Sequence, residues 1–321
     1  MSFVFLVFGF GQEGTLFRPG SSDGMKELSF SLSGQINARL TGPLLMLSSA
    51  FLFAVMDCLV KALGPPFRVW DIAFYRFACS TAILLFYATR NQTRLCSPDW
   101  KLLIYRGIAG SAAFLTLVPA IRMIPISTAM LLFYSYPAFA AFFAASLFKE
   151  QSGKELLWII VTLGGVAIFL DSRLEGGIFG QLLSLLGAAF AGLAVASLRK
   201  ARQTNGSVII YLYFCIIGTA MTCIPFFSSP ILPCSLNEWL ILSGIVSSSL
   251  IAQLLMNEGF RYCSSFQGSL FLTGEVVFVA FWGFAFLSET LSRRSLIGGA
   301  MILLSIIALT RRFSSDSGLR P

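Results

Sequence analysis

The chain contains no histidine and little charge. Only 12% of its 321 residues are charged, about half of what soluble proteins carry. The absence of histidine removes the commonest general base, the commonest transition-metal ligand and the commonest pH switch. The pattern G-x-x-x-x-G-K-[ST] does not occur, so nothing indicates built-in ATP hydrolysis. These absences argue against metal or Ser-His hydrolysis and against an ATP-driven machine.

The cysteines and basic residues also lack the patterns that mark common binding sites. Seven cysteines form no C-x-x-C pair, and we interpret them as small packing residues. The net charge is +8, but the basic residues are scattered through short loops without the aromatic interleaving of a nucleic-acid surface. We expect no nucleic-acid partner, no metal and no cofactor.

Apolar residues dominate the chain. They make up 56% of it, and the mean hydropathy is +0.80, so the bilayer is the expected solvent. Continuously apolar runs favour helices over alternating barrel strands. The sequence therefore predicts an all-α integral membrane protein with ten transmembrane helices. The ten runs are Pro43–Leu63, Asp71–Thr89, Ile104–Ile121, Pro125–Phe148, Leu156–Leu170, Ile178–Leu198, Val208–Phe227, Leu240–Asn257, Phe266–Leu287 and Leu296–Thr310.

The chain repeats itself with a shift of 138 or 139 residues. A duplicated membrane unit is typical of secondary transporters, whose binding site lies between the two halves. The matched pairs are Gly42 and Gly180, Lys61 and Arg199, Trp100 and Trp239, Arg122 and Arg261, and Glu150 and Glu289.

The distribution of basic residues predicts the orientation. Most of the 23 lysines and arginines fall inside if both termini are cytoplasmic. Five helices per half is an odd number, so the second half enters from the opposite side and the repeat is inverted. The Gly- and Ser-rich stretch before Thr41 is expected to be loop, and Met25 is an alternative start. The expected parts are an N-terminal cytoplasmic segment 1–42, five-helix repeats 43–171 and 178–312, and a tail 313–321.

Two matched segments resemble a known family. AIRMIPISTAMLLFYSYPAFAAFFAASLFKE resembles the fourth helix of the drug/metabolite transporter superfamily, EamA branch, and GFRYCSSFQGSLFLTGEVVFVAFWGFAFLSET resembles its ninth. The second segment departs from the family at Val276, where proline is usual, while Pro137 keeps it in the first. The resemblance implies transport of small organic molecules, often export of amino acids or related metabolites, across a bacterial inner (plasma) membrane.

Glu275 is the leading candidate for a functional residue. It lies in the middle of the predicted ninth helix with no basic residue within a turn, and charge there is costly. The matching residue of the first half is Tyr136, beside Pro137. Interrupted helices at matching positions of two repeats indicate a binding site, and Pro137 and Gly274 are the expected interruptions. Glu275 either faces a cavity and carries a proton, or stays neutral and hydrogen-bonds a neighbouring helix.

Other polar residues in the predicted helices have open roles. Asp57 either pairs with Lys61 one turn later or forms part of a cavity wall or proton site. Tyr134 and Tyr136 do not share a helix face, so we expect at most one of them, preferably Tyr136, to line the cavity. The further candidates for substrate contact are Gln253, Asn257 and Thr273, and the expected structural charges are Lys61, Arg76, Arg122 and Arg261.

The sequence favours a secondary active transporter that works by alternating access, with proton coupling as a hypothesis. Its expected substrate is a small polar metabolite such as an amino acid, moved by export. An uptake carrier for an adenosyl metabolite such as S-adenosylmethionine is an alternative. A non-transporting membrane scaffold or receptor is the alternative from another class, and an enzyme is disfavoured. Both a monomer and a homodimer remain open.

Overall fold

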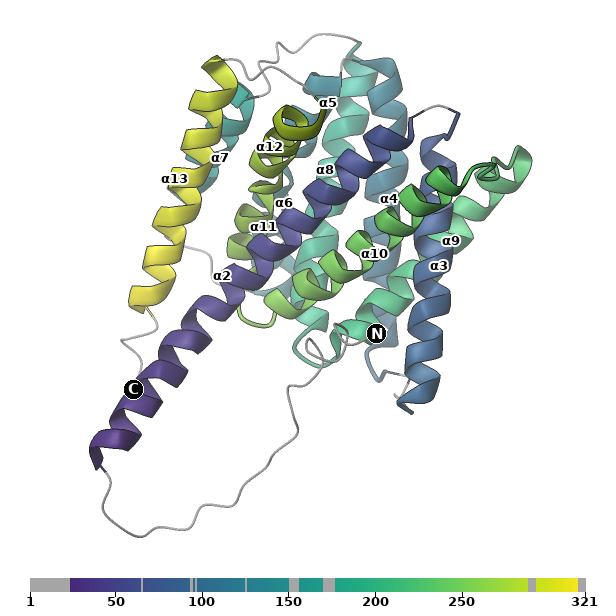
Figure 1. Cartoon of the computed structure of the whole chain (residues 1–321). Helices are drawn as coiled ribbons and strands as arrows, with labels where there is room; N and C mark the ends of the chain where they lie inside the picture. The colour runs from purple at the N-terminus through teal and green to yellow at the C-terminus, as the bar shows by residue number, and fades with distance from the viewer. Residues whose placement is uncertain are drawn as a thin grey trace. The chain divides into compact units, whose positions relative to one another are not determined.

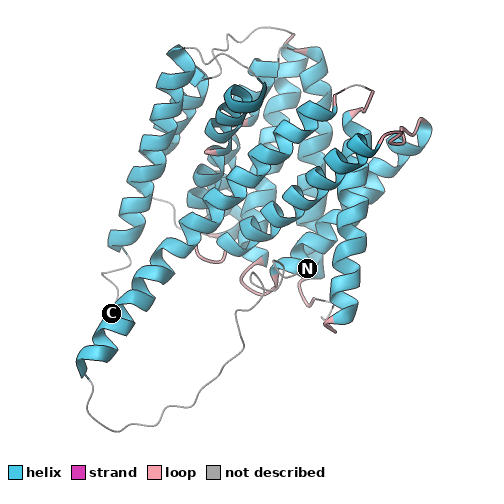
Figure 2. Cartoon of the chain, in the orientation of Figure 1, coloured by secondary structure: helices cyan, strands magenta, loops and turns pink. Residues whose placement is uncertain are grey.

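We describe the chain from a computed structural model. It describes residues 24–64, 66–92, 95, 97–124, 126–149, 156–169, 177–287 and 293–316. The regular secondary structure of these residues is entirely helical (Figure 2), which confirms the all-α prediction for them. The helices, labelled as in Figure 1, are α2 (Gly24–Leu63), α3 (Val69–Arg90), α4 (Trp100–Met123), α5 (Ile126–Phe133), α6 (Tyr136–Phe148), α7 (Leu156–Phe169), α8 (Ile178–Ala201), α9 (Ser207–Ser228), α10 (Leu236–Gly259), α11 (Ser265–Thr273), α12 (Glu275–Leu287) and α13 (Arg293–Asp316).

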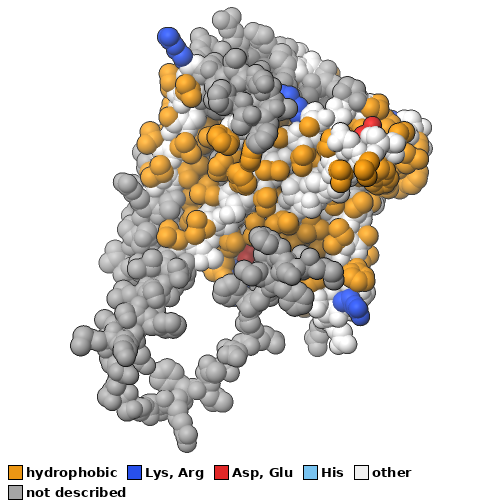
Figure 3. Space-filling model, in the orientation of Figure 1, with side chains coloured by type: hydrophobic (Ala, Val, Ile, Leu, Met, Phe, Trp, Pro, Cys, Tyr) orange, Lys and Arg blue, Asp and Glu red, His pale blue; other side chains and the backbone are white. Residues whose placement is uncertain are grey.

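Six helical segments are long and apolar enough to cross a membrane. Their outer sides carry large apolar side chains: Phe86 is 68% exposed and Ile224 is 79% exposed. Figure 3 shows a mostly apolar described surface, with the visible Lys and Arg side chains towards its upper and lower edges. Such a surface suits lipid rather than water. The six segments are Leu40–Leu63, Val69–Arg90, Ala129–Phe148, Ile178–Ala201, Ser207–Ser228 and Leu236–Gly259, and shorter apolar helices cover Ser265–Val279 and Leu296–Ala308.

The helices after residue 39 pack in a recurring pattern. Helix α4 contacts α8 and α9, α3 contacts α9 and α10, and α6 contacts α8 and α11. Helices α7 and α13 lie beside each other, at the left of Figure 1. The largest cluster of buried apolar side chains includes Met46, Phe260, Phe266 and Phe271. The inner polar groups therefore lie among closely packed helices.

Glycine allows the closest of these approaches. A Cβ atom added at Gly192 of α8 would lie 2.5 Å from the Phe139 Cβ and 2.6 Å from the Ala140 backbone nitrogen of α6. No side chain fits at such distances, so α6 and α8 touch through their backbones. Small residues serve this purpose in membrane helices, where close packing replaces the hydrophobic effect.

The predicted fourth and ninth helices are each broken into two. The first break lies at Tyr134 and Ser135, between α5 and α6, and the second lies at Gly274, between α11 and α12. Ser135 and Gly274 are 139 residues apart, so the breaks occupy the same position of the repeat. Pro137 has no backbone N–H to continue α5 and sits in the first turn of α6.

The second break forms without a proline. Gly274 donates a backbone hydrogen bond of 3.1 Å to the Phe271 carbonyl, and Val277 donates one of 3.0 Å to the Gly274 carbonyl. These i to i+3 bonds tighten the turn, as at a helix end. The departure at Val276 from the family's usual proline therefore does not remove the break.

The prediction of a loop before Thr41 is wrong for the residues that the structure describes. Helix α2 begins at Gly24. The glycine and serine content suggested loop, but Leu28, Leu32, Ile36 and Leu40 recur every four residues, which is helical spacing. No proline interrupts residues 24–42, so this periodicity prevails over composition. Residues 1–23 and 317–321, and the matched acids Glu150 and Glu289, lie outside the described residues.

Candidate functional site

Two carboxyl groups from opposite halves of the sequence meet inside the helices. The side chains of Asp57, in α2, and Glu275, the first residue of α12, form a hydrogen bond with each other. Both residues are half-buried. Arg76 of α3 lies close enough to interact electrostatically with both. We name Asp57 and Glu275 together the carboxyl pair.

The break at Gly274 positions Glu275. A Cβ atom at residue 274 would lie 3.1 Å from the Ile306 Cδ1 of α13 and 3.6 Å from the Leu47 Cδ2 of α2. The break is therefore packed between α2 and α13, and glycine fits there. Glu275 lies in the first turn of α12, where the helix dipole stabilises negative charge.

The sequence left open whether Asp57 pairs with Lys61. Lys61 is exposed in the last turn of α2, and the Asp57 carboxyl group is hydrogen-bonded to Glu275. The spacing of i and i+4 makes the lysine a local neighbour of Asp57, and the tertiary fold also brings Asp57 to α12. Spacing along the sequence does not show this second contact, because the two carboxyl groups come from different repeats.

Both tyrosines lie beside the carboxyl pair. The Tyr136 hydroxyl donates a hydrogen bond of 3.1 Å to the Ser269 carbonyl of α11 and also bonds the Thr273 side chain. Tyr134 interacts electrostatically with Glu275 and Asp57. We expected at most one of them to line a cavity, because they do not share a face of a continuous helix. The helix breaks at Tyr134 and Ser135, and both tyrosines are buried.

The further candidates for substrate contact, Gln253 and Asn257 of α10 and Thr273 of α11, are buried. The Asn257 side-chain amide donates a bond of 3.2 Å to the Ser207 carbonyl of α9, which ties the two helices together. The Thr273 hydroxyl donates one of 3.0 Å to the Ser269 carbonyl of its own helix. The buried side-chain oxygens of Gln253 and Asn257 have no hydrogen-bond partner among the residues that the structure describes. These two side chains keep hydrogen-bonding capacity that the described residues do not use.

The predicted structural charges belong to different helices or loops. Arg261 is exposed after α10, and its guanidinium is 3.8 Å from the Glu258 carboxylate, as expected from their spacing. Glu258 also pairs with Arg202 and accepts a bond of 2.6 Å from the Ser207 hydroxyl. Arg122 is in the last turn of α4, and its side chain lies outside the described residues.

Sequence reasoning missed Arg106. In the sequence it is one of the many basic residues whose distribution predicts the orientation, yet it is only 4% exposed. Its guanidinium lies 4.0 Å from the centre of the Phe214 ring of α9. The signal in the sequence is Gly110 one turn later, because glycine leaves room beside a large side chain on a helix face.

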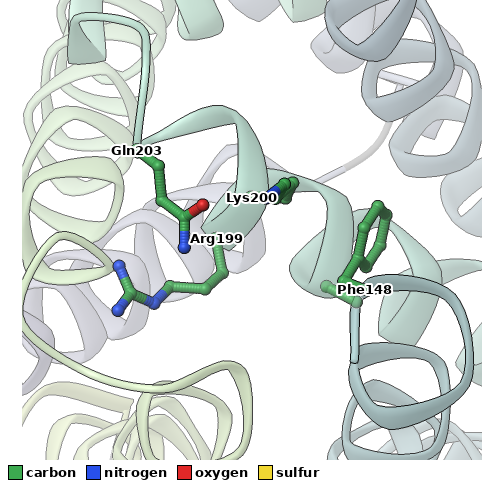
Figure 4. A pocket seen from close by; sticks show the side chains of 5 residues that line it. Phe148, Arg199, Lys200 and Gln203 are labelled. Carbon is green, nitrogen blue, oxygen red and sulfur yellow. The ribbon is translucent and has the colours of Figure 1, made fainter. Parts of the chain in front are cut away.

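A small pocket lies elsewhere, at the end of α8. Arg199, Lys200 and Gln203 line it from α8 and the following turn, and Phe148 lines it from the end of α6 (Figure 4). The Arg199 guanidinium donates a bond of 2.8 Å to the Phe260 carbonyl, near the end of α10. The pocket is thus separate from the carboxyl pair. Within the described part of the chain, no group of three or more acidic or cysteine residues could hold a metal ion.

The long apolar helices and the lipid-compatible surface define a multi-pass integral membrane protein. The sequence profile of the EamA-like transporter family matches the chain twice, over residues 40–171 and 178–311. The chain therefore belongs to the EamA-like transporter family, and it is a transporter rather than an enzyme.

Two relatives of the chain are named as transporters of particular compounds. It is 27% identical to the pseudopaline exporter CntI of Pseudomonas aeruginosa, over 84% of this chain and 96% of that one. It is 22% identical to the S-adenosylmethionine uptake transporter of Rickettsia bellii, over 77% of this chain and 85% of that one. A protein crystal structure that is 16% identical superposes with a TM-score of 0.73, over 84% of this chain and 98% of that one, and shows the same fold.

Proposed function

We propose that the protein is a proton-coupled secondary carrier that exports a small polar metabolite with an amino group, such as an amino acid or a related compound. The observation that carries this proposal is the carboxyl pair. A hydrogen bond between two carboxyl groups needs a proton on at least one of them, because ionised carboxylates only accept. We therefore infer that Asp57 and Glu275 share at least one proton among the apolar helices.

A proton held at the carboxyl pair can be exchanged for a substrate. Two like charges in a poorly solvated site repel each other, so the pair resists losing its last proton until a cation or solvent replaces it. A substrate amino group is such a cation. Proton and substrate then compete for the same carboxyl groups, which is a sufficient basis for exchange of one for the other across the membrane.

Contacts between repeat-equivalent residues support two inverted halves, approximately residues 43–171 and 178–312. The hydroxyls of Thr81 and Thr219, which are 138 residues apart, lie 3.5 Å from each other. A residue meets its own counterpart only at a two-fold axis. An axis in the membrane plane would give the alternating access of a rocking carrier.

The repeated glycines support the same symmetry. A Cβ atom at Gly42 would lie 2.9 Å from the Tyr262 Cβ, and one at Gly180 would lie 3.2 Å from the Met123 Cβ. Tyr262 and Met123 are 139 residues apart, so matched glycines contact matched partners in the opposite half. We place both termini in the cytoplasm of a bacterial inner membrane from the distribution of basic residues.

Uptake of an adenosyl metabolite is the second candidate. The uptake transporter of Rickettsia bellii, named for S-adenosylmethionine, aligns over most of the chain. S-adenosylmethionine carries an amino group that the carboxyl pair would also accept. The exporter from Pseudomonas aeruginosa has the higher identity, and we therefore place export first.

Flux measurements in proteoliposomes test both candidates. Labelled amino acids and adenosyl metabolites are measured in both directions, with and without a pH gradient, for the wild type, Glu275→Gln and Glu238→Gln. Glu238 is an acid at the start of α10, where it caps the helix, so its variant controls for loss of a carboxylate. We expect gradient-driven flux in the wild type and the control and its loss in Glu275→Gln. An unchanged pH dependence in Glu275→Gln would contradict the proposal.

A further inference from the structure

We propose that Arg106 and Arg76 bind the carboxylate of a zwitterionic substrate whose amino group lies at the carboxyl pair. This inference rests on the proposed carrier function and assigns its substrate class. It starts from Arg106, an arginine that is buried in α4 at 4% exposure. Its Nε and Nη1 atoms are buried and have no hydrogen-bond partner among the described residues.

No carboxylate in the described part of the chain pairs with Arg106. Its close contact is the Phe214 ring, 4.0 Å from the guanidinium carbon. The groups that act on it electrostatically are Cys215 and Tyr211, which are neutral at pH 7, and the cation Arg76. A buried charge without a counter-charge is costly. The cost is explained if a bound anion completes the site.

The position of Arg76 connects this cation to the carboxyl pair. Arg76 interacts electrostatically with Asp57 and Glu275 and with Arg106. Its buried Nε atom also has no partner among the described residues. The polar groups thus run from two acids through Arg76 to Arg106. An amino group at the acids and a carboxylate at the arginines match this order of charges.

Aromatic rings and glycine hold the two guanidinium groups in place. The Arg76 guanidinium carbon is 5.5 Å from the Phe77 ring centre, and the Phe77 and Phe214 rings pack edge to face at 5.1 Å. A Cβ atom at Gly110 would lie 3.2 Å from the Arg106 Nη1 and 2.9 Å from the Phe214 ring. Arginine bound on an aromatic face keeps its planar edge for a carboxylate.

Binding measurements without a pH gradient separate this inference from proton coupling. The protein in lipid nanodiscs is heated with acetate, with L-methionine or L-methioninamide, and with L-phenylalanine or L-phenylalaninamide. A ligand that binds the folded state raises Tm. We expect acetate to raise the Tm of the wild type. We also expect at least one of the two amino acids to raise this Tm more than its matching amide does. Glu275→Gln should keep the acetate response, so a failure of coupling does not hide the anion site.

Three variants test the role of Arg106. Arg106→Gln should weaken binding of the carboxylated probes by about tenfold or more and leave the ligand-free Tm unchanged or higher. Gly110→Ala should also weaken binding of the carboxylated probes, because the added Cβ displaces the Arg106 guanidinium. This variant changes no charge. Arg90→Gln removes an exposed arginine at the end of α3 and should match the wild type.

Two results would overturn the assignment. One is a wild type whose Tm does not respond to acetate or to either amino acid. The other is an Arg106→Gln variant that responds to the probes like the wild type. If that variant also has a lower ligand-free Tm, Arg106 belongs to the packing around Phe214 and not to a binding site.

Discussion

The two helix breaks occupy the same position of the repeat but carry different chemistry. In the first half, Tyr136 starts α6 and Pro137 follows it. In the second half, Glu275 starts α12 after Gly274. Tyr136 donates its hydroxyl to a neighbouring carbonyl, while Glu275 shares a hydrogen bond with an acid of the other half. The repeat thus decides where the polar groups lie, and the differences between the halves decide what they do.

The largest expected effect comes from removing the partner of Glu275. Asp57→Asn leaves the break intact but removes one of the two acids. We expect gradient-driven flux to fall by about 100-fold, since a proton-transferring group is lost, and its pH dependence to change as in Glu275→Gln. Flux against pH in proteoliposomes measures both. If Asp57→Asn transports normally while Glu275→Gln does not, the two acids do not act as a pair.

Gly274→Val is expected to have the next largest effect. The new side chain would meet the Ile306 and Leu47 side chains, and overpacking of this kind costs about 1–3 kcal/mol. The Tm in detergent should therefore fall. Ser135→Ala, at the matched position of the first half, is the control and should have a smaller effect. Equal effects at the two positions would show that the second break is not the more tightly packed one.

Tyr136→Phe tests whether the Tyr136 hydroxyl at the first break stabilises the fold or takes part in proton transfer. It removes the hydroxyl that bonds the Ser269 carbonyl, which contributes about 1 kcal/mol. We expect a modest fall in Tm and an unchanged pH dependence of flux. A shift in the pH profile would instead place Tyr136 in proton transfer and weaken the contrast between the two breaks.

The smallest effect is expected for Val276→Pro, which gives the second break the proline of the first. Residue 276 is the second residue of α12, where a helix needs no backbone N–H and proline is tolerated. We expect a change in stability within about 0.5 kcal/mol and normal flux. A large loss of Tm would mean that the Val276 side chain, which is buried, cannot be replaced by a ring.

The sequence was sufficient to predict those features of the fold and the candidate site that follow from apolar periodicity or from the internal repeat. Apolar runs predict the helices, and the repeat alone matches Glu275 with Tyr136. The local rules failed where tertiary contacts decide the outcome. The hydrogen bond between the Asp57 and Glu275 carboxyl groups is one example, because the two residues lie in different repeats. Arg106 resembles an orientation signal, because its one local cue, Gly110, does not show that α9 covers it.

The contact between Thr81 and Thr219 has a consequence for the origin of the chain. In a symmetric homodimer, a residue on the two-fold axis touches its own copy in the other subunit. Under the proposed two-fold symmetry, the two threonines stand in that relation within one polypeptide, as expected if a gene for a dimer-forming half was duplicated and fused. After fusion, the sequence of each half can change independently of the other. The two subunits of a homodimer have the same sequence, so they could not have a glutamate at Glu275 and a tyrosine at the matched Tyr136.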